Sequence, residues 1–368
     1  MSVVYKKLED VCEILDSRRV PITAKDRKAG TYPYYGANGL QDYVADYIFD
    51  DELVLLAEDG GNFGSKERPI AYRVSGKCWV NNHAHVLKAK PNMHVDYLCY
   101  ALMFYDTEGL VNGATRQKLT QAAMRQMVIP YRDMTEQLQI IKKISQIVRS
   151  IEKRKEELQL LDQLVKSRFI ELFGYYDLTR PQESWVTIKE IGTVVGGATP
   201  KTDHDEYWGG SYRWITPAEL DADSGYIYDS IRKLTKAGVE SCSLQEMPVG
   251  TVILSSRAPI GKVAIAGNTF YCNQGFKNII CKEGITPRYL YTVLLLNVKY
   301  LNSLGRGATF KEISKGIVES IRIPVPSMKL QKRFAAFVEQ TDKSKLAVQK
   351  GLQELEILKK SLMQQYFG

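Results

Sequence analysis

The sequence has no long hydrophobic run. Its longest apolar candidate, residues 289–296, is much shorter than the roughly 18 apolar residues of a membrane-spanning helix, so we expect no transmembrane segment. The N-terminal lysines are not followed by an apolar stretch, and we expect no secretion signal. Cysteine is scarce, with six residues among 368 and no CxxC pair, which is typical of reduced thiols. These absences predict a cytoplasmic protein.

Motifs of common catalytic and metal sites are also absent. Gly261-Lys262 lacks the earlier glycine and the following Ser or Thr of a Walker loop, and no GxGxxG separates a strand pattern from a helix pattern. The chain has only four histidines and no recognisable Ser-His-Asp set. His83 and His85 alternate along a predicted strand and would face one side, but no Cys or His stands at metal-ligand spacing from them. We therefore expect no catalytic residues, no metal and a binding protein rather than an enzyme.

The chain instead contains an internal repeat. A shift of 194 residues aligns residues 113–174 with 307–368 without a gap, giving 17 identities in 62 positions. Both copies begin with Gly-Ala-Thr, reach an Ile-Pro pair at Pro130 and Pro324, and end with Phe-Gly. Upstream of these copies the two halves are only loosely related. The sequence therefore predicts a duplicated chain in which two unlike modules each precede a shared segment.

The shared segments have the pattern of long helices. No glycine or proline occurs between residues 131 and 173, and apolar residues recur every seventh position. A helix of 39 residues is about 58 Å long, so we expect each helix to pair with its own repeat; the alternative is a helix folded over its own module. The predicted seam consists of Ile144, Ile151, Leu158, Leu161, Val165, Val348, Leu352, Leu355 and Leu362.

The modules combine short β-branched runs with Gly, Asn and Pro loops and a few short helices, which indicates a mixed α/β fold. Each also carries polar and basic residues beside glycines, a composition suited to contacts with phosphates and base edges. The alternative is that most of them are solvated loop residues. The candidate DNA-binding residues are Lys66, Arg68, Asn82, His83, Arg116, Lys118, Lys201, Trp214, Arg257, Lys262, Gln274, Lys277, Arg306 and Lys311.

Several motifs resemble the specificity (S) subunit of type I restriction–modification systems, and the resemblance covers essentially the whole chain. The most specific are TVILSSRAPIGKVAIAG at 251–267 and NQGFKNI at 273–279, followed by GGATP at 196–200, WITPAEL at 214–220 and the duplicated helix segment. The first module departs from the pattern, with Glu58-Asp59 where the second has Ser256-Arg257. It also lacks the second proline that Pro326 supplies before the later helix.

The resemblance implies two target-recognition domains joined by two long helices that form an antiparallel coiled coil with pseudo-two-fold symmetry. The boundaries would be 1–130 and 185–324 for the recognition domains, 131–174 and 325–368 for the helices, and 175–184 for a linker. It further implies a non-catalytic prokaryotic subunit that reads a split, asymmetric target in double-stranded DNA. Partners would be two methyltransferase subunits, which would dock on the paired helices at the predicted seam and use S-adenosylmethionine to methylate adenine. Restriction subunits, which use ATP and Mg²⁺, are possible further partners.

Two other functions remain open from the residues alone. A coiled-coil scaffold that reads no sequence is one, although unlike modules on matched helices argue against it. A stand-alone nuclease is the other, but no carboxylate-plus-lysine set supports it. The net charge of +8 does not decide the matter, because six of the eight excess positive charges lie in the helical segments 135–173 and 327–368. The modules are almost neutral, so we expect weak DNA binding by the isolated chain and tighter binding in a complex.

Overall fold

The computed structural model describes residues 4–113, 116–220, 225–257, 259–307 and 311–368. The chain divides into two compact units. Unit 1 contains Met1–Glu157 and Val348–Gly368, and unit 2 contains Leu158–Ala347. Two 40-residue helices, α4 (Met134–Phe173) and α10 (Met328–Phe367), each contribute to both units. No helix among the described residues is long and apolar enough to cross a membrane.

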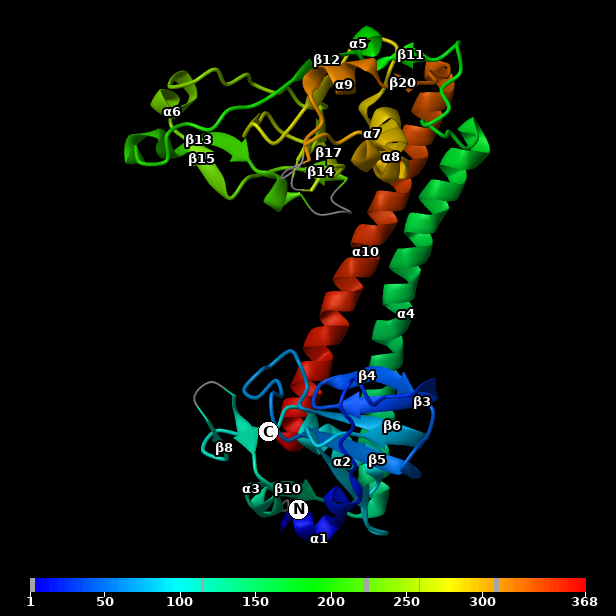
Figure 1. Ribbon diagram of the computed structural model, residues 1–368, viewed down its shortest axis with the longest axis vertical. Helices are drawn as coiled ribbons and strands as arrows, with labels where there is room; N and C mark the ends of the chain where they lie inside the picture. Colours follow the sequence, from blue (N-terminus) through cyan, green and yellow to red (C-terminus); the bar gives the residue numbers. More distant parts are fainter. Residues whose placement is uncertain (1–3, 114–115, 221–224, 258, 308–310) are drawn as a thin grey trace. The chain divides into compact units, whose positions relative to one another are not determined.

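Unit 1 is built on a six-stranded sheet with the order β2-β7-β5-β6-β3-β4 (Figure 1). Its central strand β5 is antiparallel to both neighbours, and the five residues Leu53 to Ala57 are fully buried because both faces of the sheet are covered there. Helix α2 (Val95–Met103) packs on β5 and β6. The strands are β2 (Cys12–Ile14), β3 (Ala29–Gly36), β4 (Gly39–Val44), β5 (Phe49–Ala57), β6 (Ala71–Val80) and β7 (Ala84–Ala89).

Short elements complete unit 1 beside this sheet. Strand β1 pairs with β10 directly before α4, and β8 pairs with β9 in the loop that leads to α3. Their bounds are β1 (Val4–Lys7), α1 (Leu8–Val11), η1 (Asp16–Arg18), β8 (Val111–Asn112), β9 (Lys118–Leu119), α3 (Gln121–Gln126) and β10 (Val128–Tyr131).

Unit 2 repeats this plan with a five-stranded sheet, β12-β19-β16-β17-β14, and adds a three-stranded sheet, β15-β13-β18. Strand β11 pairs with β20 before α10, as β1 pairs with β10 before α4. The strands are β11 (Val186–Thr187), β12 (Gly192–Val195), β13 (Trp208–Ile215), β14 (Tyr226–Ile227), β15 (Arg232–Leu234), β16 (Val252–Leu254), β17 (Val263–Ala266), β18 (Tyr271–Cys272), β19 (Asn278–Cys281) and β20 (Arg322–Ile323). The helices are α5 (Ile188–Ile191), η2 (Asp205–Tyr207), η3 (Pro217–Glu219), α6 (Lys236–Glu240), α7 (Pro287–Leu296), α8 (Val298–Ser303) and α9 (Lys315–Ser320).

The two long helices are antiparallel, as the family resemblance implies. In unit 1 the end of α10 lies on the start of α4, where Arg132 Nη1 donates to the Tyr366 carbonyl at 3.1 Å. In unit 2 the start of α10 lies on the end of α4, where the rings of Phe169 and Phe334 are 5.3 Å apart. The alternative prediction, in which a long helix folds over its own module, also holds in part, because Ile140 and Ile144 of α4 belong to the core of unit 1.

The predicted seam residues all turn inward to some degree. Ile144, Ile151 and Val348 are buried, and the other six are half-buried. Helix α4 begins later than the predicted span 131–174, because β10 runs to Tyr131 and the Asp133 carboxylate accepts the Glu136 N–H at 2.9 Å. Helix α10 also begins later than the predicted span 325–368, at Met328. Gly174 ends α4 with a φ of 83°. The predicted linker 175–184 is anchored by Leu178, which lies in the core of unit 2.

One repeated contact fixes the start of each long helix. The fully buried Gln137 accepts the His94 N–H at 2.8 Å and donates to the carbonyls of Asn92 and Arg132 at 3.0 and 2.8 Å. Its repeat partner Gln331, also fully buried, accepts the Thr286 N–H at 2.7 Å. Gln331 donates to the carbonyls of Gly284 and Pro326 at 3.0 and 2.9 Å. In both units the amide therefore joins the long helix to the turn before α2 or α7.

Replacing Gln137 with Leu tests this contact. Each polar partner left unsatisfied costs about 1–3 kcal/mol, so Gln137→Leu should lower local stability by at least about 2 kcal/mol and speed amide exchange at the start of α2. Hydrogen exchange read by mass spectrometry on the full chain measures this. Gln146→Leu, on an exposed face of the same helix, should leave exchange unchanged. Equal exchange in the two variants would contradict the assigned role.

Candidate nucleic-acid interface

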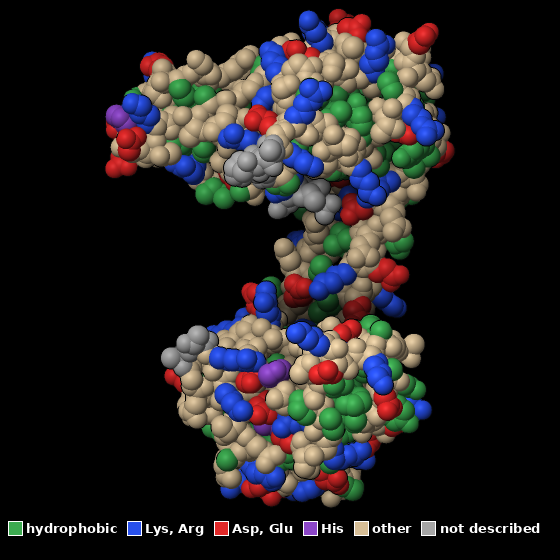
Figure 2. Space-filling view, viewed as in Figure 1, with side chains coloured by type: hydrophobic (Ala, Val, Ile, Leu, Met, Phe, Trp, Pro, Cys, Tyr) green, Lys and Arg blue, Asp and Glu red, His purple; other side chains and the backbone are tan. Residues whose placement is uncertain are grey.

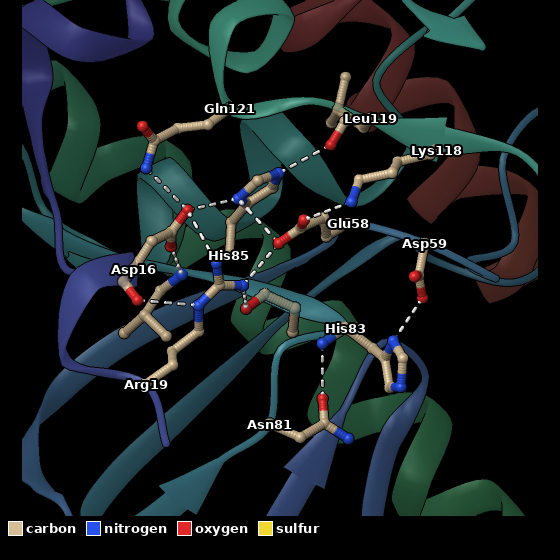
Figure 3. A network of polar contacts seen from close by, with 12 residues as sticks. Asp16, Arg19, Glu58, Asp59, Asn81, His83, His85, Lys118, Leu119 and Gln121 are labelled. Carbon is tan, nitrogen blue, oxygen red and sulfur yellow. Dashed lines mark hydrogen bonds and ion pairs between the residues drawn. The ribbon is translucent and has the colours of Figure 1, made fainter. Parts of the chain in front are cut away.

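A buried polar network lies at one end of β5 and β7 in unit 1 (Figure 3). His85, on β7, is 1% exposed, and its Nδ1 lies 2.6 Å from Asp16 Oδ2. Its Nε2 lies 2.9 Å from the Leu119 carbonyl. The backbone carbonyl of Leu119 accepts the hydrogen bond from Nε2, and Nδ1 faces the Asp16 carboxylate. His85 thereby ties β9 to the turn η1.

Arg19 supplies a guanidinium to this network. Its Nη1 donates to Glu58 at 2.6 Å and to the Ala84 carbonyl at 2.8 Å, and its Nη2 lies 3.5 Å from Asp16. Asp16, Glu58 and His85 could together offer three metal-ligand atoms within 4.8 Å of one another, a grouping that their sequence spacing does not reveal. Because the Arg19 guanidinium already lies against both carboxylates, a metal would have to displace it. The cluster is therefore explained as an ion-pair network.

Asp16 is held ionised by its neighbours. Burial by itself raises the pKa of Asp16. The hydrogen bond and charge of His85, the Val86 N–H at 2.9 Å and the charge of Arg19 outweigh burial and hold the pKa of Asp16 below its ordinary value of 3.8. The ionised Asp16 carboxylate thus contributes to the stability of unit 1.

Four of the predicted DNA-binding residues lie at the outer edge of this network. His83 Nδ1 and Arg116 Nη2 lie 2.6 and 2.7 Å from Asp59 Oδ1. Lys118 Nζ lies 3.1 Å from Glu58, and Asn82 is exposed on the same turn as His83. The two carboxylates at 58 and 59, the feature in which the first module departs from the sequence pattern, are thus the anchors of this basic group.

The expectation that His83 and His85 share one face is wrong. His83 precedes β7, and a turn held by Asn81 Oδ1, which accepts the His83 N–H at 2.8 Å, directs the ring to Asp59. His85 points instead to Asp16 in the interior (Figure 3). The remaining unit 1 candidates, Lys66 and Arg68, are exposed on the loop between β5 and β6. Arg68 there lines an open groove with Asn38, Asn62 and Tyr72.

In unit 2 the corresponding place brings together two of the motifs. The Ser256 N–H donates to the Gly275 carbonyl at 2.8 Å, which joins the loop after β16 to the loop before β19. The side chain of Arg257 lies over Gly275, where an added Cβ would be 3.5 Å from Arg257 Nε. Among the described residues the Arg257 guanidinium has no ion pair. Lys277 Nζ donates to Glu312 at 3.0 Å and to Ser256 Oγ at 3.3 Å.

Other predicted residues of unit 2 have structural partners. Gln274 Oε1 accepts the Thr199 hydroxyl at 2.5 Å, and Lys262 Nζ donates to the Pro217 carbonyl at 3.1 Å. Lys201, Arg306 and Lys311 are exposed. The structure brings Arg257, Gln274 and Lys277 to adjacent loops. The repeated Ala-Thr dipeptides at 114–115 and 308–309 lie outside the described residues.

Trp214 requires a correction. It is 2% exposed, its Nε1 donates to the Ala198 carbonyl at 3.1 Å, and its ring packs on Trp208 5.1 Å away. Because its indole ring is buried, Trp214 is a core residue and is not available to DNA in this structure. Its place in the WITPAEL motif reflects packing.

Comparison with known families decides the identity of the fold. The model of the type I restriction modification DNA specificity domain matches residues 2–161 and 182–357. The chain belongs to this family. Each matched region contains one module and the greater part of the long helix that follows it. The predicted family and the two-domain architecture with long helices are confirmed.

Individual specificity subunits resemble the chain to different extents. A type I restriction enzyme specificity subunit of Methanocaldococcus jannaschii, MjaIX, is 42% identical over 185 residues. That match covers 49% of this chain and 43% of the relative, so it spans less than half of the relative's length. The EcoR124I/EcoR124II specificity subunit of Escherichia coli is 25% identical over 330 residues, which cover 85% of this chain and 76% of the relative.

Solved structures support the same fold. The S subunit of the type I restriction-modification system of M. genitalium aligns with a TM-score of 0.60 at 14% identity. The alignment covers 100% of this chain and 96% of that subunit. A chain from a study of complex assembly and conformational transition of the type I R-M system aligns with a TM-score of 0.61 at 16% identity, covering 100% and 99%. At these identities the likeness concerns the fold of the specificity subunit.

The surface charge of the specificity subunit is mixed. On the face drawn in Figure 2, basic and acidic side chains are interspersed over each unit. This agrees with the near neutrality of the modules in the sequence.

Replacing Asp16 with Asn tests the buried network. Removing one partner of a buried ion pair costs about 3–5 kcal/mol, so Asp16→Asn should lower the melting temperature of unit 1 at neutral pH. Since the folded pKa of Asp16 is lowered, its contribution is fully present above 3.8 and is lost only as pH falls through the folded value. Calorimetry at several pH values should show the gap to wild type narrowing below pH 3.8. Asp10→Asn, at an exposed carboxylate in α1, is the control; a gap that persists in acid would refute the assignment.

Proposed function

We propose that this specificity subunit reads an asymmetric, bipartite target in double-stranded DNA, one half-site with each unit. The proposal rests on the observation that the two units share one backbone plan but carry different polar groups at the ends of their sheets. The Gln137 and Gln331 contacts and the sheet plan are the same in both units, whereas the polar groups beside β5 and β16 differ. Two copies of one frame suit the pseudo-two-fold axis of duplex DNA, and unlike ends suit unlike half-sites.

In this proposal base reading falls to the side chains that remain accessible on these ends. Arginine and lysine pair with guanine, and glutamine and asparagine with adenine, in the major groove. Arg257 and Gln274 are such groups in unit 2, and Arg116 and Asn82 are such groups in unit 1. Exposed lysines such as Lys66, Lys201 and Lys311 would contact phosphates and set the register.

The long helices are proposed to separate the half-sites and to dock partners. A helix of 40 residues is about 60 Å long. Besides the seam, several apolar residues of the helices are about half exposed or more, which leaves them available for contact with a partner. These are Leu160, Leu164, Leu346, Ile357 and Leu358. They would contact methyltransferase subunits, which would bind S-adenosylmethionine in the cytoplasm of the host; restriction subunits would bring ATP and Mg²⁺.

Methylation sequencing tests the proposal. The chain would be expressed with its methyltransferase subunit in a host that lacks other adenine methylation, and the modified adenines mapped across the genome. We expect one split motif whose two halves differ. A palindromic motif, an undivided motif or no sequence preference would refute the proposal, and the last result would favour a scaffold.

Arg257→Ala should affect only the half-site read by unit 2. Loss of a bidentate guanine contact costs about 1–3 kcal/mol of discrimination, so one guanine in that half-site should become degenerate while the other half-site stays intact. Lys282→Ala provides a control of the same charge at the far end of β19. An unchanged motif and methylation rate in Arg257→Ala would show that Arg257 reads no base.

A further inference from the structure

Equivalent positions in the two units carry opposite charges. The Leu119 N–H donates to the Glu58 carbonyl at 2.7 Å, and the Ile313 N–H donates to the Ser256 carbonyl at 3.0 Å. The next residues form matching antiparallel bridges, Asp59 with Lys118 in unit 1 and Arg257 with Glu312 in unit 2. One backbone arrangement therefore presents an acid opposite a base in unit 1 and a base opposite an acid in unit 2.

In unit 1 the acid at this place holds a basic side chain at the surface. Asp59 Oδ1 lies 2.7 Å from Arg116 Nη2 and 2.6 Å from His83 Nδ1, while Arg116 Nη2 and His83 Nδ1 are 3.4 Å apart. The Arg116 guanidinium also lies over Gly60, where an added Cβ would be 3.5 Å from Arg116 Nε. A carboxylate and a bare glycine backbone thus define where this guanidinium lies.

The fold has little need of this ion pair. The side chain of Arg116 is 60% exposed and that of His83 is 36% exposed, and surface ion pairs add little to stability. The loop that carries Arg116 is already held by His85 through the Leu119 carbonyl and by Glu58 through Lys118. Unlike Asp16 and Glu58, Asp59 pairs only with side chains that face solvent, those of Arg116 and His83. This points to a role for Asp59 in orienting these two side chains.

We propose that Asp59 is a positioning residue that orients Arg116 to read a guanine in the first half-site. A guanidinium has five N–H donors, so the bond to Asp59 leaves a neighbouring pair for the O6 and N7 acceptors of guanine. Anchoring the side chain beforehand removes the cost of ordering it on DNA. In unit 2 the position equivalent to Asp59 is occupied by Arg257. The same backbone position therefore carries a base-reading residue in unit 2 and a positioning residue in unit 1. This inference rests on the proposed function.

The test uses the full chain in complex with its methyltransferase subunit. Wild type, Asp59→Ala, Asp59→Asn, Arg116→Ala and the double variant Asp59→Ala/Arg116→Ala are compared by genome-wide methylation sequencing. Arg116→Ala should lose discrimination at one guanine of the first half-site by about 5- to 150-fold. Asp59→Ala should relax the same base, Asp59→Asn should do so less because its amide oxygen still accepts a hydrogen bond, and the double variant should equal Arg116→Ala alone.

Each outcome separates this inference from the proposal beneath it. A wild-type complex without a bipartite motif would overturn the proposed function and this inference together. A bipartite wild-type motif that Asp59→Ala leaves unchanged would overturn the positioning role alone. So would a loss of methylation at both half-sites, or additive effects in the double variant, since these indicate damage to the fold or a separate role. Relaxation confined to one shared guanine would establish the role.

Discussion

The buried amide at the start of each long helix is the contact on which the rest of the architecture depends. Gln137 and Gln331 are fully buried, and each makes three hydrogen bonds to backbone groups. Two of these bonds go to the turn before α2 or α7, and the third goes to a residue just before the long helix. A buried amide is tolerated only when its partners are all present. The contact therefore fixes the direction in which each helix leaves its unit.

That constraint separates what is shared from what can vary. Tyr97 and Tyr289 repeat the pattern one turn further on, each donating its hydroxyl to the carbonyl of the proline before a long helix, at 3.0 and 2.9 Å. The junction between module and helix is thus conserved between the two units in its hydrogen bonds. The sheet ends that carry Asp59 and Arg257 are not part of this junction, so their charges can be reversed without disturbing it.

Sequence reasoning succeeded where the pattern is periodic or duplicated. The two long helices follow from the repeat and from the seven-residue spacing of their apolar positions. It could not find the network of Asp16, Arg19 and His85, because these residues are brought together across as many as 69 positions of sequence by strand pairing. It also misread Trp214, since a tryptophan in a family motif gives no sign of whether its ring faces solvent or the core.

The charge distribution has a mechanistic consequence. Most of the positive excess lies on the helical segments, and in unit 1 the basic residues beside β5 are already paired with Glu58 and Asp59. Paired cations attract phosphate weakly, so the modules gain little affinity from general attraction to DNA. What they retain is the geometry of individual donors, which distinguishes bases rather than strengthening binding to any sequence. If the subunit reads DNA as proposed, it would discriminate between sequences but bind weakly on its own, and tight binding would depend on contacts supplied by its partners.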